Sequence, residues 1–264
     1  MRGVAQIKSM LRDRLPARWQ VPVKHLFLKA TGGLEAELAL LPLLLAPGER
    51  ALDIGANYGT YALTLARLGA RVDLFEPNPA IAAVLAAWAH GRTGLAVHAL
   101  ALSDRAGTAE LVIPGEGGIE HDSSAALAGG AVASGRRVAV PLAPLDSLAI
   151  RDAALIKIDV EGHEDAVLRG AAATIAASSP ALIVEIEQRH IARPIAEAFA
   201  DILRQGYRGW FLCGGVLLPL DRFDADRHQR FGEHGVPYCN NFIFLAEARI
   251  ARGDYARLLA RVAG

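Results

Sequence analysis

The stretch Leu52-Asp53-Ile54-Gly55-Ala56-Asn57-Tyr58-Gly59 decides the fold class of this chain. The apolar residues that lead into it predict a short β-strand, and the two glycines predict a tight turn that a ligand can approach closely. Residues 60–68 have the composition of a helix, and Gly69 ends it. A strand, a glycine-rich turn and a helix form the unit from which nucleotide-binding open α/β sheets are built.

The same alternation continues along the chain. We predict further strands at 71–75, 95–102, 155–160, 181–186, 207–212 and 242–245, and further helices at 80–90, 164–177 and 194–205. Two shorter strands, 110–113 and 138–142, flank a loop over 115–135 that is rich in Gly, Ser and Ala. This pattern favours a doubly wound, mostly parallel sheet with helices on both faces.

The ends of the chain are less regular. We expect an N-terminal helical extension over 1–34, one domain over 35–250 and a C-terminal helix over 251–264. Residues 1–34 mix basic and apolar side chains, which is typical of surface helices packed on a core and also of a lid or a membrane-surface helix. The segment 214–241 is too long for a tight hairpin, so it forms either a surface excursion or a lid over the acceptor.

Composition excludes several classes of protein. The 264 residues are 52% hydrophobic and include 28 basic and 28 acidic side chains, so the formal net charge is zero. This balance disfavours a protein that binds nucleic acid through bulk positive charge. Two cysteines are too few for a disulfide scaffold, and no apolar run reaches the roughly 20 residues that span a bilayer. We expect a cytoplasmic protein without stable membrane insertion.

Glu76 narrows the identity of the nucleotide. It ends the second strand, where a carboxylate can accept both hydroxyl groups of a ribose. Asn57 occupies the place of the second glycine in a dinucleotide fingerprint, and no lysine separates Gly59 from Thr60 as a P-loop requires. The ligand should therefore carry a ribose and place no phosphate on the turn, which fits S-adenosylmethionine.

We assign the cofactor contacts to residues of the turn and of the following strand ends: Asp53, Gly55, Asn57, Gly59, Glu76 and Asp104. Asp53 would face the cationic amino-acid end of the cofactor, and Asp104 would accept from the adenine amine.

A second group of charges lies on the fourth main strand. Lys157, Asp159 and Glu161 alternate with apolar residues, which predicts that they share one face, and Glu185 ends the next strand. Charges on a central strand are costly unless they are paired or functional. A purely structural explanation of these charges is an ion pair of Lys157 with Asp159 or Glu185. The functional explanation is that the charged groups take part in catalysis, and it gives four candidate catalytic residues: Asp159, Glu161, Glu185 and His163.

At these residues the chain resembles the FkbM family of S-adenosylmethionine-dependent methyltransferases. The matching stretches are 52–59, 75–79, 101–104, 156–164 and 167–171, with Glu185 and 241–244 similar to later landmarks of the family. The segment Ile156-Lys157-Ile158-Asp159-Val160-Glu161-Gly162 is the most specific. The resemblance implies a class I, Rossmann-like methyltransferase fold, with a mostly parallel seven-stranded sheet and an antiparallel last strand. It also implies O-methylation of a sugar, a polyketide or another secondary metabolite.

An alcohol is a poor nucleophile, so methyl transfer to it benefits from a general base. We expect Asp159 or Glu161 in this role, with Glu185 or His163 as second choice. A metal triad of Asp159, Glu161 and His163 is an alternative, although we assign no metal ion.

Two rival functions remain. A nicotinamide-dependent oxidoreductase is disfavoured by Asn57 and by the lack of a Tyr-x-x-x-Lys pair. A cofactor-binding protein that has lost catalysis and serves as an assembly partner is disfavoured by the carboxylates. The expected partner is a small-molecule hydroxyl acceptor, with no nucleic acid, and an oligomer is compatible with the sequence.

Overall fold

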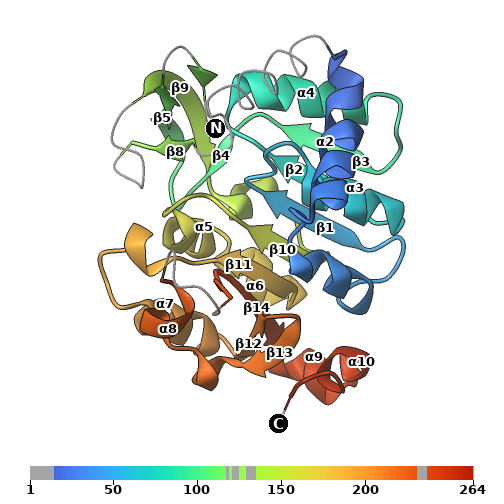
Figure 1. Cartoon of the computed structure of the whole chain (residues 1–264), viewed down its shortest axis with the longest axis vertical. Coiled ribbons are helices and arrows are strands. Elements are labelled where there is room, and N and C mark those ends of the chain that lie inside the picture. Colours follow the sequence, from blue (N-terminus) through green and yellow to red (C-terminus); the bar gives the residue numbers. More distant parts are fainter. Residues whose placement is uncertain (1–14, 117–118, 121–124, 129–134, 231–236, 264) are drawn as a thin grey trace.

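The computed structural model describes residues 15–116, 119–120, 125–128, 135–230 and 237–263. Its centre is an eight-stranded sheet with the strand order β13-β12-β14-β11-β10-β1-β2-β3 (Figure 1). The strands are β1 (Arg50–Ile54), β2 (Arg71–Phe75), β3 (Leu95–His98), β10 (Ala153–Ile158), β11 (Ala181–Glu185), β12 (Tyr207–Cys213), β13 (Val216–Pro219) and β14 (Asn241–Ala246).

Strand directions confirm the predicted fold class. β3, β2, β1, β10 and β11 are parallel, and β14 pairs antiparallel with both β11 and β12. The sheet has one strand more than the seven expected, because β13 folds back on β12 across Gly214 and Gly215. Both glycines have positive φ, +58° and +83°, as a two-residue hairpin turn of this kind requires. Part of the segment expected as an excursion or lid is therefore an edge strand.

Helices cover both faces of this sheet and enclose two separate cores. One face packs against α2 (Ala17–Thr31), α3 (Thr60–Arg67), α4 (Pro79–Ala89), the 3₁₀ helix η1 (Ala36–Leu43) and α10 (Ala256–Leu259). The other face packs against α5 (Glu164–Gly170), α6 (Ala172–Ser178) and α7 (Ile195–Leu203). The single helix expected over 164–177 is wrong, since Ala171 leaves the helical region at φ −109° and ψ 3°.

A second, four-stranded sheet lies beside the first. Its strands are β4 (Ala101–Leu102), β9 (Arg136–Ala143), β5 (Gly107–Ile113) and β8 (Ala126–Leu127), in that order, and they enclose a small core of their own. The single strand predicted over 95–102 is therefore wrong. The Leu100 N–H donates to the His98 carbonyl, so the chain turns and β4 pairs with β9. The short hairpin of β6 (Gly115–Glu116) and β7 (Ile119–Glu120) lies in the stretch expected as a loop.

The remaining elements are short. α8 (Ala225–His228) follows β13, and the C-terminal part forms α9 (Glu247–Ala251) and α10 where we expected one helix. Several predicted segments lie partly outside the described residues, among them 1–14 of the extension, 117–118, 121–124 and 129–134 of the loop over 115–135, and 231–236 of the segment 214–241. Within the described part of the chain, no helix is both long and apolar enough to cross a membrane.

Candidate active site

The glycine turn after β1 is fixed by a close backbone contact. Gly55 has φ +77°, and a Cβ atom there would lie 1.8 Å from the carbonyl oxygen of Asp159. No side chain fits at that distance, so Gly55 lets the turn pack against the end of β10. Asn57 is also in the left-handed region, at φ 47°, which is uncommon for a residue other than glycine. The turn is thus held in an unusual conformation next to the carboxylates.

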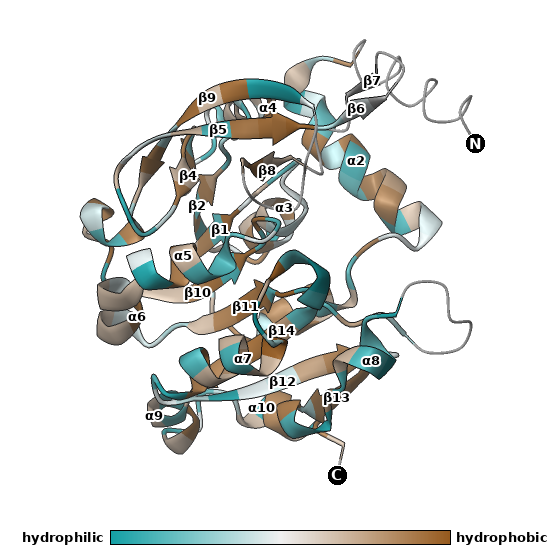
Figure 2. Cartoon of the chain, turned by 90° about the vertical axis from the view of Figure 1, so that its left-hand side faces the viewer, coloured by the Kyte–Doolittle hydropathy of each residue, from teal (hydrophilic) through white to brown (hydrophobic). Residues whose placement is uncertain are grey.

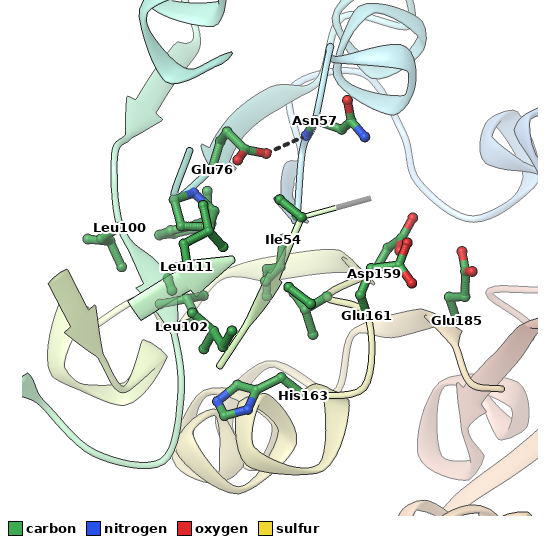
Figure 3. Close-up of a pocket in the computed structure, with 18 residues that line it drawn as sticks. Ile54, Asn57, Glu76, Leu100, Leu102, Leu111, Asp159, Glu161, His163 and Glu185 are labelled. Atoms are coloured by element: carbon green, nitrogen blue, oxygen red, sulfur yellow. Dashed lines mark hydrogen bonds between the residues drawn. The ribbon is translucent and has the colours of Figure 1, made fainter. Parts of the chain in front are cut away.

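Glu76 is held in place by two backbone amides. Its Oε2 accepts from the Asn57 N–H and its Oε1 from the Asn78 N–H, both at 2.8 Å. Figure 3 shows the carboxylate turned toward the glycine turn. The structure therefore joins the end of β2 to the turn after β1, as nucleotide-binding sheets do at their carboxyl ends.

A cavity opens at this edge of the sheet and encloses about 120 Å³. One side is apolar and is lined by Leu100, Leu102, Leu111 and the β8 residues Ala126 and Leu127. Asp159, Glu161 and Glu185 lie on the opposite side (Figure 3). The sequence reasoning missed the apolar wall, because much of it comes from the second sheet, whose packing on the first follows from no local pattern.

Lys157 lies beneath the acidic side and is almost fully buried. Its Nζ lies 3.6 Å from Asp159 Oδ2 and donates to Asn241 Oδ1 at 2.8 Å. The nearby carboxylates, Asp159 foremost, raise the pKa of Lys157 against the opposing effect of burial, which is the larger single influence. The predicted pairing of Lys157 with Asp159 is therefore present, and Asp159 still lines the cavity.

The Lys157 network extends to the segment before η1. The Tyr61 hydroxyl donates to Glu35 Oε2 at 2.7 Å, and Asn241 Nδ2 lies 3.3 Å from the same oxygen. Lys157 Nζ lies 5.1 Å from the centre of the Tyr61 ring. Sequence reasoning did not find Glu35 or Tyr61, since no motif connects them with the strand.

Glu161 does not continue the strand. β10 ends at Ile158, and Glu161 has φ +52°, so the predicted alternation through Glu161 is wrong. The turn is stabilised by the buried Glu164, whose Oε1 accepts from the Gly162 N–H at 3.0 Å and lies 3.3 Å from the Val160 nitrogen. Burial, and after it the charge of Asp159, raises the pKa of Glu161 to about 7.

Glu185 and His163 lie at two different sides of the cavity (Figure 3). Asn240 Nδ2 donates to Glu185 Oε1 at 2.7 Å, and burial, followed by the charge of Asp159, raises the pKa of Glu185 strongly. His163 Nε2 lies 2.9 Å from the Ser103 hydroxyl, and burial lowers its pKa. Among the described residues, no three His, Cys, Asp or Glu side chains are placed to hold a metal ion.

Three residues assigned to the cofactor from the sequence, Asp53, Gly59 and Asp104, are not among the described residues that line the cavity. Asp53 is buried on β1, and burial raises its pKa to about 7, with Lys157 opposing the rise. Its Oδ2 has no hydrogen-bond partner within the described part of the chain. Asp104 accepts from Arg169 at 2.8 and 3.1 Å, and this contact lowers its pKa. Gly59 precedes α3 in the left-handed conformation, at φ +70°.

Comparison with known proteins identifies the family of this chain. A family model described as the methyltransferase FkbM domain matches residues 53–208. The solved structure of methyltransferase FkbM from Methylobacillus flagellatus KT is similar, with a TM-score of 0.50 and 17% identity. That match covers 89% of this chain and 57% of the other, so the chain spans little more than half of that relative. No curated protein matches the chain.

Two other solved structures are similar to a smaller extent. A TehB-like SAM-dependent methyltransferase from Corynebacterium glutamicum ATCC 13032 Kitasato has a TM-score of 0.43 and 12% identity, covering 86% of this chain and 96% of the other. Magnesium protoporphyrin IX methyltransferase from Synechocystis PCC 6803, solved with bound SAM, has a TM-score of 0.42 and 12% identity, covering 87% and 79%.

Proposed function

This chain belongs to the FkbM methyltransferase family, and on that premise we propose that it methylates a hydroxyl group of a small molecule, with S-adenosylmethionine as methyl donor. One observation carries the proposal. A single cavity joins an apolar wall, a carboxylate held at the end of β2 and a cluster of carboxylates at the ends of β10 and β11. These three surfaces match the base, the ribose and the cationic end of this donor.

The residues of the cavity fit the donor part by part. Leu102 and Leu111 would pack against the adenine, and Glu76 would accept hydrogen bonds from the ribose hydroxyls. Asp159 offers negative charge to the end that carries the sulfonium and the ammonium groups, and Glu185 lines the cavity beside it. Asp53 does not line the cavity and would influence the donor site indirectly, through its charge interaction with Lys157. Asp104 would also act indirectly, by holding α5 in place through its hydrogen bonds from Arg169.

The donor supplies a methyl group on a positively charged sulfur. The chain must bring the acceptor oxygen into line with that carbon and take its proton, and positioning supplies much of the rate. We assign the proton transfer to Glu161, since a base with a pKa of about 7 is half ionised at neutral pH. Asp159 stays paired with Lys157, and Glu185, whose pKa is raised by burial, would hold a proton and donate a hydrogen bond to the bound acceptor.

Donor binding is tested by calorimetric titration of the purified protein with S-adenosylhomocysteine and, in a parallel cell, with NAD⁺. We expect heat from S-adenosylhomocysteine alone, and a clear loss of affinity in Glu76→Ala, because the ribose loses its acceptor. Glu49→Ala serves as the control, since Glu49 caps a turn that starts at Ala46 and is absent from the cavity lining. Heat from NAD⁺ alone would overturn the assignment and favour hydride transfer. Transfer of label from S-adenosylmethionine to polyhydroxylated small molecules is then measured to find the acceptor.

A further inference from the structure

Helix α2 exposes an apolar face to solvent. Trp19, Val23, Leu26 and Phe27 are 51%, 46%, 65% and 45% exposed. Their spacing of i, i+4, i+7 and i+8 places them on one side of the helix, while Val21 and His25 are buried on the other side. A surface helix normally shows polar residues on its outer face. Helix α2 differs, because apolar side chains lie on its outer face as well as on its buried one. Figure 2 shows the hydrophobic segments along α2 at the edge of the molecule.

Charge is distributed unevenly around this face. Helices α2, α3 and α4 pack together and contain four basic residues, Arg18, Lys24, Lys29 and Arg67, and no aspartate or glutamate within their bounds (Figure 1). The whole chain nevertheless has a formal net charge of zero. Arg18 and Lys29 are exposed and lie at the border of the apolar face. An exposed apolar stripe that includes tryptophan and lies beside exposed cations is complementary to an anionic lipid surface.

Helix α2 packs on the glycine turn after β1 by the side opposite to this exposed face. A Cβ on Gly59 would lie 3.4 Å from Val21 Cγ1, and Lys24 Nζ is 4.2 Å from the centre of the Tyr58 ring. The inner side of α2 therefore rests on the turn after β1, and its outer side faces away from the domain. A surface bound to α2 would lie one helix diameter from the glycine turn.

We propose that the outer face of α2, made by Trp19, Val23 and Leu26 with Arg18 and Lys29, is a docking site for an anionic lipid bilayer. The apolar side chains enter the interface between headgroups and acyl chains, and the two cations contact lipid phosphates. The chain binds such a membrane peripherally, by this helix alone. The proposal does not depend on the methyl-transfer reaction.

The tryptophans provide a direct readout. Trp88 and Trp210 are 2% and 4% exposed, so Trp19 is the one exposed tryptophan of the three, all of which are described. The full-length protein is titrated with vesicles of phosphatidylcholine, and with vesicles of phosphatidylcholine mixed with phosphatidylglycerol. We expect a blue shift of the emission and co-sedimentation with the mixed vesicles only, both weakened by added salt.

Two variants separate the apolar contribution from the charges. Leu26→Glu and the double variant Arg18→Glu with Lys29→Glu alter exposed positions, and each should lower the vesicle partition coefficient about tenfold or more. Leu203→Glu, at a position 38% exposed on α7, is the matched control and should bind as the unaltered chain does. Calorimetry with S-adenosylhomocysteine should give the same affinity for all of them.

Four results would overturn the proposal. One is binding that is equal to neutral and to anionic vesicles, and another is no binding to either. The third is a blue shift that grows with protein concentration without lipid, which would assign the face to a second copy of the chain. The last is protection of Trp19 from acrylamide in the free protein, which would show that the chain covers its own helix.

Discussion

Replacement of Gly55 by alanine tests whether the glycine turn and the carboxylate strand form one packed unit. The added Cβ would lie 1.8 Å from the Asp159 carbonyl oxygen and 2.8 Å from its carbonyl carbon. Both are backbone atoms, so no flexible side chain can move away. The Asp159 N–H also donates to the Ile54 carbonyl at 3.0 Å, and separation of the two segments would strain this bond.

The magnitude follows from two costs. The left-handed φ of +77° costs an L-residue about 1–2 kcal/mol. Relief of the overlap requires backbone shifts of the kind that cost about 1–3 kcal/mol in overpacked cores. The variant should therefore lose roughly 2–5 kcal/mol of unfolding free energy, which for a chain of this length lowers Tm by roughly 4–20 °C.

Gly48→Ala is the matched control. Gly48 has a similar φ of +84°, and no described atom lies within 4 Å of a Cβ placed there. It should lose only the backbone cost of about 1–2 kcal/mol. Urea unfolding of both variants gives the comparison, and calorimetry with S-adenosylhomocysteine shows whether Gly55→Ala also disturbs the cavity. Equal destabilisation of the two variants would refute the close contact as the reason for glycine at position 55.

Three further predictions concern the charged groups. Methyl transfer should rise as the pH rises through about 7, because Glu161 acts as a base only when ionised, and Glu161→Gln should abolish this rise and lower turnover about 10²- to 10⁴-fold in a labelled-donor assay. Lys157→Met should cost about 1–3 kcal/mol in urea unfolding, because the buried Asn241 amide oxygen loses its donor and Asp159 loses its partner. Arg71→Met, which breaks an exposed pair with Asp152, should cost about 1 kcal/mol or less.

The third concerns Asp53, whose folded-state pKa of about 7 exceeds the ordinary 3.8. The folded state therefore holds a proton more tightly than the unfolded state between these values, and unfolding free energy falls as pH rises across them, by up to about 4 kcal/mol. Asp53→Asn should flatten this dependence, and parallel urea titrations at pH 5 and 8 measure it. An unchanged slope would contradict the assignment.

Local sequence determined much of the fold, because strands, helices and turns follow from short-range patterns. Short runs of apolar residues predicted β1, β2, β10 and β11, and the glycines of 52–59 predicted the turn. Glu76 was placed correctly beside that turn, since parallel strands end at one edge of a sheet. The hairpin at Gly214-Gly215 had a local signal too, which a closer reading of the two glycines would have used.

Tertiary structure alone decided how the candidate site is assembled, because its contacts join residues distant in sequence. Lys157 meets Asn241 across 84 positions, and Asp104 meets Arg169 across 65, which draws Asp104 toward α5. The end of β10 at Ile158 and the left-handed turn at Glu161 depend on the buried Glu164, so strand periodicity could not place the carboxylate. Short-range propensity selects the elements, whereas burial and long-range pairing select which of their side chains meet in the cavity.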